Sequence, residues 1–231
     1  KRDLPWRKTH DPYQIWISEI ILQQTRVDQG LPYYTKFIDK YPSVRDLANA
    51  PIDEVLRLWQ GLGYYSRARN LHRCAKIVVE KYEGNFPAER SELLKLPGVG
   101  PYTSAAIASL AFGKREAVVD GNVIRIITRL YGIDEDISEQ KTINGIRAIV
   151  DGLIPSKRPD LFNQAIMEFG ALFCIPNSPT CEACCFLGIC VAQNSGTTSS
   201  IPYKSKKVKK RSRFFTYLII NIGENYLLHK R

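Results

Sequence analysis

Apolar side chains recur with a helical period along most of the chain. From about residue 12 to residue 173 they return every three or four positions, which is the spacing of one face of an α-helix. An early segment shows the pattern in Tyr13, Trp16, Ile17, Ile20 and Ile21. Breaks are predicted at Gly30, Pro42, Pro51, Gly61, Gly63, Gly84, Pro87, Pro97, Gly98, Gly113, Gly132 and Pro155. Short helices joined by short loops predict an all-α globular region.

The pattern changes after Cys190. Residues 194–200 are small and polar and predict a flexible linker. Residues 214–222 are rich in β-formers, and residues 223–225 carry turn signals before Tyr226 begins a second run. A single hairpin is at best marginally stable, so we expect these residues to be the truncated start of a further, β-containing domain.

Charge is concentrated next to this linker. The 231 residues carry a net charge of +10, which suggests an anionic partner. Seven of those charges lie within residues 204–213, leaving +3 for the rest. The run fits a solvated basic linker, or a segment that contacts DNA or directs targeting. No apolar run approaches the roughly 20 residues that span a bilayer, so no membrane association is expected.

Five of the six cysteines lie between residues 174 and 190, which favours a reduced, intracellular setting over a disulfide framework. The four with the spacing C-x6-C-x2-C-x5-C are Cys174, Cys181, Cys184 and Cys190. Zinc sites usually pair two C-x2-C units across a longer loop, whereas these thiolates can surround a [4Fe–4S] cubane. We therefore expect a [4Fe–4S] cluster, with zinc or free thiols as alternatives. Cys74 and Cys185 are expected to be buried small apolar residues.

A glycine turn occupies residues 96–103. Gly98 and Gly100 can adopt positive φ, and Pro101 suits the first turn of a helix. Outward-pointing N–H groups at such a helix start can hold a phosphate. An ordinary helix–helix turn explains the same residues about equally well. Asp120, within Val-Asp-Gly-Asn, falls at the start of the following helix.

Glu19 lies inside an apolar helix, with Ile15 and Leu22 as its neighbours on one face. It fits a boundary glutamate that reaches solvent. The alternative is an acid whose pKa is raised by desolvation, ready to donate a proton. Paired with Asp120, it would supply the two carboxylates of glycosidic bond cleavage.

Polar and aromatic residues mark two further turns, 23–25 and 61–67. Alone, they fit loop and packing residues. Inserted into a duplex, a glutamine and a tyrosine could instead fill the gap that an extruded base leaves.

Together and in this order, the Leu-Pro-Gly-Val-Gly turn, Val-Asp-Gly-Asn and the four cysteines resemble the helix-hairpin-helix base-excision glycosylases that carry an iron–sulfur cluster. Within that superfamily, residues 4–7, 16–19, 22–25 and 61–70 resemble the MutY family of adenine DNA glycosylases. The similarity covers nearly all of residues 4–190.

The resemblance implies two helical lobes. A six-helix barrel with the hairpin would span residues 11–113, and an iron–sulfur cluster domain would combine residues 1–10 with 114–193. A basic linker, 194–213, would lead to 214–231, which looks like the opening of the family's Nudix-like domain. Cys185 departs from the family pattern, because the family commonly has proline after the third ligand.

The resemblance also implies chemical roles. Glu19 would protonate the departing adenine and later activate water. Asp120 would stabilise the cationic sugar, directly or through a transient covalent bond. Tyr102 and Asn122 would position groups around this pair.

DNA contacts follow in the same way. Trp6 and Arg7 would line the adenine pocket. Gln24, Leu62 and Tyr64 would wedge the duplex opposite 8-oxoguanine, and Thr25 would contact that base. Further DNA contacts are expected from Gln23, Gly98, Val99 and Gly100.

Strand-cutting relatives carry a lysine two residues after the last hairpin glycine, as a Schiff-base nucleophile. This chain has Tyr102 there, and a phenol cannot form an imine. The resemblance therefore implies a monofunctional glycosylase of base excision repair that hydrolyses the N-glycosidic bond of adenine opposite 8-oxoguanine or guanine. Related glycosylases for thymine mismatches or oxidised pyrimidines, or a non-catalytic DNA-binding or redox-sensing module, are the alternatives.

The expected partner is double-stranded DNA. We expect a monomer in the bacterial cytoplasm or nucleoid, or in a eukaryotic nucleus or mitochondrion.

Overall fold

The computed structural model describes residues 2–205, 214 and 220–227. Its elements, in chain order, are η1 (Pro5–Arg7), α1 (Pro12–Leu22), α2 (Val27–Lys40), α3 (Val44–Asn49), α4 (Ile52–Leu58), α5 (Ser66–Tyr82), α6 (Arg90–Leu93), α7 (Pro101–Phe112), α8 (Gly121–Tyr131), α9 (Gln140–Leu153), α10 (Pro159–Leu172), η2 (Cys181–Ala183), α11 (Val191–Asn194), β1 (Asn221–Ile222) and β2 (Asn225–Tyr226). The all-α prediction is confirmed. In the described part of the chain, none of the helices combines the length and the apolar character needed to cross a membrane.

The first lobe is built around α1. Asp11 caps this helix by accepting a hydrogen bond from the N–H of Tyr13 (2.9 Å), and Pro12 fits its first turn. Seven of its eleven residues are buried, and it packs against α2, α5 and α7. Glu19 and the turn that follows α1 are therefore carried by a helix that packs against three others.

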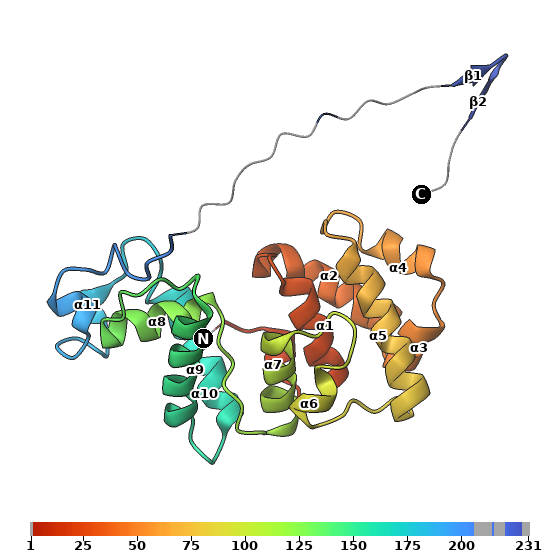
Figure 1. Cartoon of the computed structure of the whole chain (residues 1–231). Coiled ribbons are helices and arrows are strands. Elements are labelled where there is room, and N and C mark those ends of the chain that lie inside the picture. Colours follow the sequence, from red (N-terminus) through yellow and green to blue (C-terminus); the bar gives the residue numbers. More distant parts are fainter. Residues whose placement is uncertain (1, 206–213, 215–219, 228–231) are drawn as a thin grey trace.

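Buried apolar residues form two clusters. The first runs from Leu4 to Val118 and includes Trp6, whereas the second lies between Ala117 and Ile154. Figure 1 shows α1 to α7 gathered on one side of the molecule and α8 to α11 on the other. Helix α10 packs against both α7 and α8, so it joins the two lobes. The exact domain limits, 1–10 with 114–193 and 11–113, stay a prediction.

Two glycine predictions need correction. Gly30 does not break a helix but lies inside α2, and a Cβ there would come within 2.7 Å of Leu22 Cδ2. Its small size lets α2 pass close to the end of α1. In the hairpin, only Gly98 adopts positive φ (76°), whereas Gly100 is extended and precedes α7. The N–H of Val99 donates to Leu96 (3.1 Å) and so is not among the outward-pointing donors.

The described residues after α11 differ in their surroundings. Ile201 is 5% exposed, and its carbonyl accepts a hydrogen bond from Arg129 Nε (3.0 Å). Tyr203 accepts one from the N–H of Ile137 (3.0 Å), so the expected linker is tied to the second lobe as far as this point. Most of the basic run, and much of 214–231, lie outside the described residues. The predicted hairpin is present as β1 paired antiparallel with β2, with Gly223 at φ 64° in its turn.

Candidate active site

A cleft of about 610 Å³ opens between the two lobes. Its walls come from η1, the end of α1, α7, the start of α8 and one face of α10. Nine predicted site residues line it: Trp6, Arg7, Glu19, Gln23, Gln24, Thr25, Tyr102, Asp120 and Asn122. Residues far apart in the sequence therefore meet in one place, as the pairing of Glu19 with Asp120 requires.

The environment of Glu19 raises its pKa to about 7. Burial is the main cause, because a carboxylate loses hydration among apolar neighbours. A hydrogen bond from Tyr102 lowers the pKa, and the charge of Asp120 raises it. At neutral pH, Glu19 is thus present both as an acid that can donate a proton and as a base that can accept one.

Asp120 is held rigidly at the start of α8. Its Oδ1 accepts a hydrogen bond from the N–H of Val123 (2.8 Å), as an N-cap does. Its Oδ2 accepts one from Asn122 Nδ2 (2.8 Å). Asn122 in turn accepts a hydrogen bond from Arg125 Nη2 (2.8 Å). The carboxylate therefore sits at the positive end of a helix with its orientation fixed, where it favours a nearby positive charge over a neutral group.

Arg125 extends this chain of hydrogen bonds away from the cleft. It is 8% exposed. Its Nη2 also donates to the carbonyl of Gly170 on α10 (2.7 Å), and its Nε donates to the carbonyl of Cys174 (2.6 Å). Asp120 is thus connected, through Asn122 and Arg125, to the first of the four clustered cysteines.

The other predicted DNA contacts lie outside the cleft. Tyr64 is 64% exposed, whereas Leu62 is 6% exposed and packs into the first cluster. In this structure Leu62 presents little surface that could enter a duplex. The hairpin residues 98–100 do not line the cleft either.

Arg67, at the start of α5, joins the two predicted wedge turns. Its Nη1 donates to the carbonyls of Ile20, Ile21 and Gln23 (3.1, 3.0 and 2.6 Å), and its Nη2 donates to that of Leu62 (3.2 Å). The guanidinium also lies over the ring of Trp59, 5.1 Å from the ring centroid. Because these carbonyls end α1, one cation satisfies the helix terminus and fixes both turns.

Both turns hold a non-glycine residue in the left-handed region. Gln24 has φ 56° and Tyr64 has φ 46°. Such backbone is held by its surroundings and clusters at functional sites. Two of the three residues expected to wedge the duplex are therefore held in an unusual backbone conformation.

The cleft residues that the sequence interpretation missed include Arg2, Gln164 and Met167. Gln164 is 9% exposed, and neither its Oε1 nor Arg7 Nη1 has a hydrogen-bond partner among the described residues. Met167 Sδ lies 3.7 Å from the hydroxyl oxygen of Tyr102. Gln164 and Met167 lie three residues apart on α10, but no motif in the sequence marked them. The available signal was the polar character of Gln164 close to Asn163 and Glu168 on the same helix.

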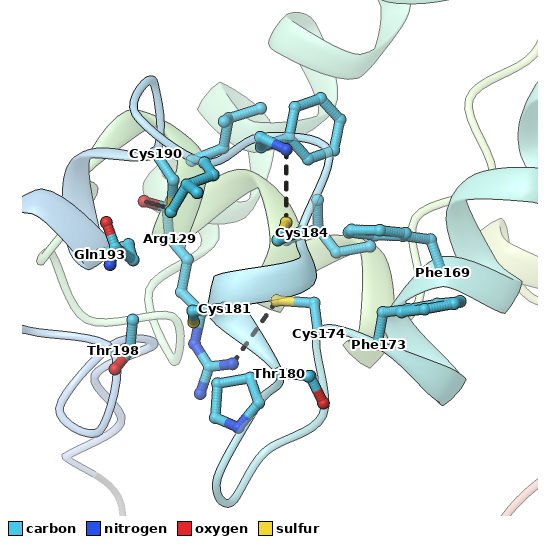
Figure 2. Close-up of a pocket in the computed structure, with 15 residues that line it drawn as sticks. Arg129, Phe169, Phe173, Cys174, Thr180, Cys181, Cys184, Cys190, Gln193 and Thr198 are labelled. Carbon is cyan, nitrogen blue, oxygen red and sulfur yellow. Dashed lines mark hydrogen bonds between the residues drawn. The ribbon is translucent and has the colours of Figure 1, made fainter.

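The four predicted ligands gather in a second place. Cys174, Cys181, Cys184 and Cys190 all line one small cavity at the end of α10 and the start of α11 (Figure 2). Within the described residues, no three ligating side chains converge on a single-ion site. The donor set itself, four thiols around one cavity, fits a thiolate-bound metal group.

Arg129 anchors the loop that carries these cysteines. It is 3% exposed. Its Nη1 donates to Cys174 Sγ (3.5 Å; Figure 2). The same Nη1 donates to the carbonyl of Ile175 (2.8 Å), and Nη2 donates to that of Pro176 (2.9 Å). The guanidinium provides both hydrogen bonds and positive charge next to the thiols.

Of the two remaining cysteines, Cys74 is buried as predicted, but Cys185 is exposed. The correction follows from its place in the loop. Cys184, which follows η2, lines the cavity, whereas Cys185 does not.

The sequence signature of the HhH-GPD superfamily of base excision DNA repair proteins matches residues 17–151. The chain belongs to the HhH-GPD superfamily. Among curated members, a human protein named adenine DNA glycosylase is 44% identical over 202 residues, which cover 84% of this chain and 37% of that protein. The adenine DNA glycosylase of Buchnera aphidicola from Acyrthosiphon pisum is 38% identical over 230 residues, covering 100% and 66%. The chain therefore spans less than two thirds of these relatives.

Solved HhH-GPD structures have the same fold. A thermostable thymine-DNA glycosylase matches with a TM-score of 0.77 and 35% identity, over 84% of this chain and 89% of that one. Endonuclease III in a non-covalent complex with DNA matches with a TM-score of 0.66 and 27% identity, over 80% and 86%. Structural neighbours of the chain thus include an enzyme observed on DNA.

Proposed function

We propose that this HhH-GPD protein is a monofunctional adenine DNA glycosylase, which hydrolyses the N-glycosidic bond of adenine paired with 8-oxoguanine or guanine. The observation that carries the proposal is the cleft, in which Glu19, with a pKa of about 7, faces the helix-capping Asp120. Curated relatives named adenine DNA glycosylase, 38–44% identical over at least 84% of this chain, support the choice of base.

The chemistry follows from these two carboxyl groups. Glu19 donates its proton to a ring nitrogen of adenine while the bond from that base to the sugar breaks, and the bonding electron pair leaves with the base. The sugar becomes an oxocarbenium-like cation, which the fixed carboxylate of Asp120 stabilises. Glu19, now a carboxylate, accepts a proton from water as its oxygen attacks the sugar. The balance is one water consumed and one adenine released.

The cleft also offers groups for the base. Arg7 Nη1 is a buried donor and Gln164 Oε1 a buried acceptor, both without a partner among the described residues. Adenine carries ring-nitrogen acceptors and an exocyclic amine donor, so the two atoms are complementary to it. A base that cannot hydrogen-bond to these two atoms would leave a buried donor and a buried acceptor without partners, which costs binding free energy.

The absence of an amine nucleophile at the hairpin supports simple base removal. Tyr102 stands two residues after Gly100 and donates a hydrogen bond to Glu19. Its hydroxyl cannot form the imine that strand cleavage by this route requires.

The four clustered cysteines would hold a [4Fe–4S] cluster. When bound, such a cluster would cross-link the loop through its four cysteine thiolates. Base hydrolysis as described needs no redox step. Arg125 and Arg129, both on α8, would hold Cys174 in place through hydrogen bonds to its carbonyl and to its Sγ.

Double-stranded DNA with a mispaired adenine is the proposed substrate and partner, and we propose that a monomer acts on it. Tyr64 and Gln24 would enter the duplex where adenine leaves it. With DNA as its substrate, the protein would act in a compartment that contains DNA.

A glycosylase assay on duplexes containing A·8-oxoguanine, A·G or T·G tests the function. We expect adenine release from the first two and no strand cleavage. Because Glu19 must be protonated, the rate should fall about tenfold per pH unit above its pKa of about 7. Trapping with borohydride should give no covalent adduct. A strong adduct would contradict the monofunctional assignment.

Thymine removal from T·G pairs is a second candidate, favoured by the 35% identity to a thymine-DNA glycosylase whose length the chain covers almost fully. Release of thymine in place of adenine would establish it. The same assay thus decides between the two bases.

A further inference from the structure

Glu168 lies on α10, next to the cleft but not in its wall. It is 8% exposed, and the cleft is lined instead by its neighbours Gln164 and Met167 on the same helix. Burial would raise the pKa of its carboxyl group, but hydrogen bonds from Arg7 and Arg2 outweigh it and hold the pKa well below the usual range. Glu168 is therefore a buried carboxylate that the proposed chemistry leaves unused.

Two arginines of the N-terminal segment converge on this carboxylate. Arg7 Nη2 donates to Oε2 (2.7 Å). Arg2 donates to Oε2 from Nε and Nη2 (3.1 and 2.7 Å), and to Oε1 from its backbone N–H (2.6 Å). The side chains of Arg7 and Glu168 are 11% and 10% exposed, so their ion pair is almost completely desolvated. Charge-assisted bonds of this length fix geometry as well as adding energy.

The consequence appears at the other end of Arg7. With Nη2 held by Glu168, Nη1 is buried and has no partner among the described residues. Arg7 lines the cleft together with Gln164, whose Oε1 is also buried and unpartnered. The planar guanidinium cannot turn one nitrogen without turning the other, so the bond to Glu168 determines where Nη1 points.

We propose that Glu168 is a positioning residue, which orients Arg7 so that its Nη1 and Gln164 Oε1 together meet the base in the cleft. This inference rests on the proposed glycosylase function. It makes the N-terminal segment, and not only the hairpin and the two carboxyl groups, part of base selection. Glu168, which does not line the cleft, thereby determines the direction of a hydrogen-bond donor that does.

The alternative is a structural clamp that only ties the N-terminal segment to α10. Arg7→Lys separates the two roles, because a lysine can keep the ion pair with Glu168 but has no second terminal nitrogen. A clamp predicts normal adenine release by Arg7→Lys. A positioning role predicts a loss on the order of 10–100-fold with an unchanged melting temperature.

A double-mutant cycle in the whole protein completes the test. Single-turnover adenine release is measured for Glu168→Gln, Arg7→Lys and the double variant on an A·8-oxoguanine duplex, at saturating enzyme. If Glu168 acts through Arg7, each single variant loses on the order of 10–100-fold and the double variant is no slower than Arg7→Lys. Asp3→Asn is the matched control, since it breaks an exposed ion pair with Lys8 on the same segment and should leave the rate unchanged.

Two results would overturn the inference. One is a Glu168→Gln or Arg7→Lys protein that releases adenine within twofold of the wild-type rate. The other is a cycle in which the two losses multiply. A wild-type protein that releases no adenine would instead reject the proposed function, and the role of Glu168 with it. If Glu168→Gln fails to fold, Glu168→Asp, which keeps the charge on a side chain one methylene shorter, takes its place in the cycle.

Discussion

The cleft and the cysteine loop, residues 174–190, are positioned in opposite ways. The cleft is framed by α1 and α7, which bury seven and eight residues respectively. None of the residues of the cysteine loop, all of them described, is fully buried. Arg129 and Arg125 hold the start of this loop through its backbone carbonyls. One site is placed by core packing, the other by two guanidinium groups and the chemistry of its sulfur atoms.

The difference implies that the two sites respond to different perturbations. Close-packed helices tolerate little change in volume, so the cleft should be sensitive to packing and its carboxyl groups to charge. A loop without buried side chains has few contacts to lose, so it should be sensitive to its arginine anchors. Each experiment below changes one region and asks whether the other follows.

Glu19→Gln should have the largest effect. Glutamine keeps the shape but cannot donate the proton, so adenine release should fall about 10²–10⁴-fold, with DNA binding retained. The measurement is single-turnover release together with binding to the same duplex. Limited proteolysis of the cysteine loop should be unchanged, because that region does not depend on the cleft. Glu80→Gln, an exposed change on α5, serves as the control and should leave the rate at the wild-type value.

Arg129→Gln should produce the next largest change, on the opposite region. Removing a buried cation that serves four acceptors should destabilise the protein by about 3 kcal/mol. We expect early proteolysis within residues 174–190 and loss of the visible colour that the proposed iron–sulfur cluster would give. Arg73→Gln, exposed on α5, should do neither. A colourless and proteolysed loop with a fully active cleft would sharpen the comparison, whereas an intact loop would contradict it.

Much of both regions could be predicted from the sequence. Helical periodicity predicted the helical region, and the spacing of the cysteines predicted that four of them meet at one place. Asp120 could be placed at the start of its helix, where a capping side chain acts on its own sequence neighbours. Local rules of this kind work because cause and effect lie within a few residues.

What the sequence did not reveal depends on distant contacts. Gly30 looked like a helix break, yet it serves the crossing of α2 over Leu22. Gln164 and Glu168 carried no motif, because their roles arise only when α10 meets the N-terminal segment. Cys185 was expected inside but is exposed, whereas its neighbour Cys184 lines the cavity. Tertiary packing determines each of these.

The third experiment uses pH. The pKa of Glu19 is raised from 4.5 to about 7, so the folded protein favours the protonated carboxyl group. Stability from this group is fully present below pH 4.5 and is lost as pH rises to about 7. Glu19→Gln has no such loss and should therefore be more stable than the wild type at pH 8, by on the order of 1–3 kcal/mol. Urea unfolding at pH 4 and pH 8 measures the difference, and a gain as large at pH 4 would contradict it.

Gly30→Ala should have the smallest effect and ask most directly whether packing shapes the cleft. A Cβ at this position would lie 2.7 Å from Leu22 Cδ2 and 3.3 Å from Ile21 Cγ2. Leu22 lines the cleft, so the flexible end of its side chain must move there. We expect a stability loss of about 1 kcal/mol with a several-fold slower adenine release, measured by thermal melting and single-turnover kinetics.

The matched control is Gly145→Ala, in the interior of α9, where a Cβ meets nothing within 4 Å. There alanine should stabilise the helix by about 0.5–1 kcal/mol and leave the rate unchanged. The same substitution in two helices thus has opposite expected signs, because only Gly30 lies where two packed helices cross at the cleft. A Gly30→Ala protein that gained stability like Gly145→Ala would mean that the crossing can relax without moving Leu22. The shape of the cleft would then have to come from its hydrogen bonds, as that of the cysteine loop does.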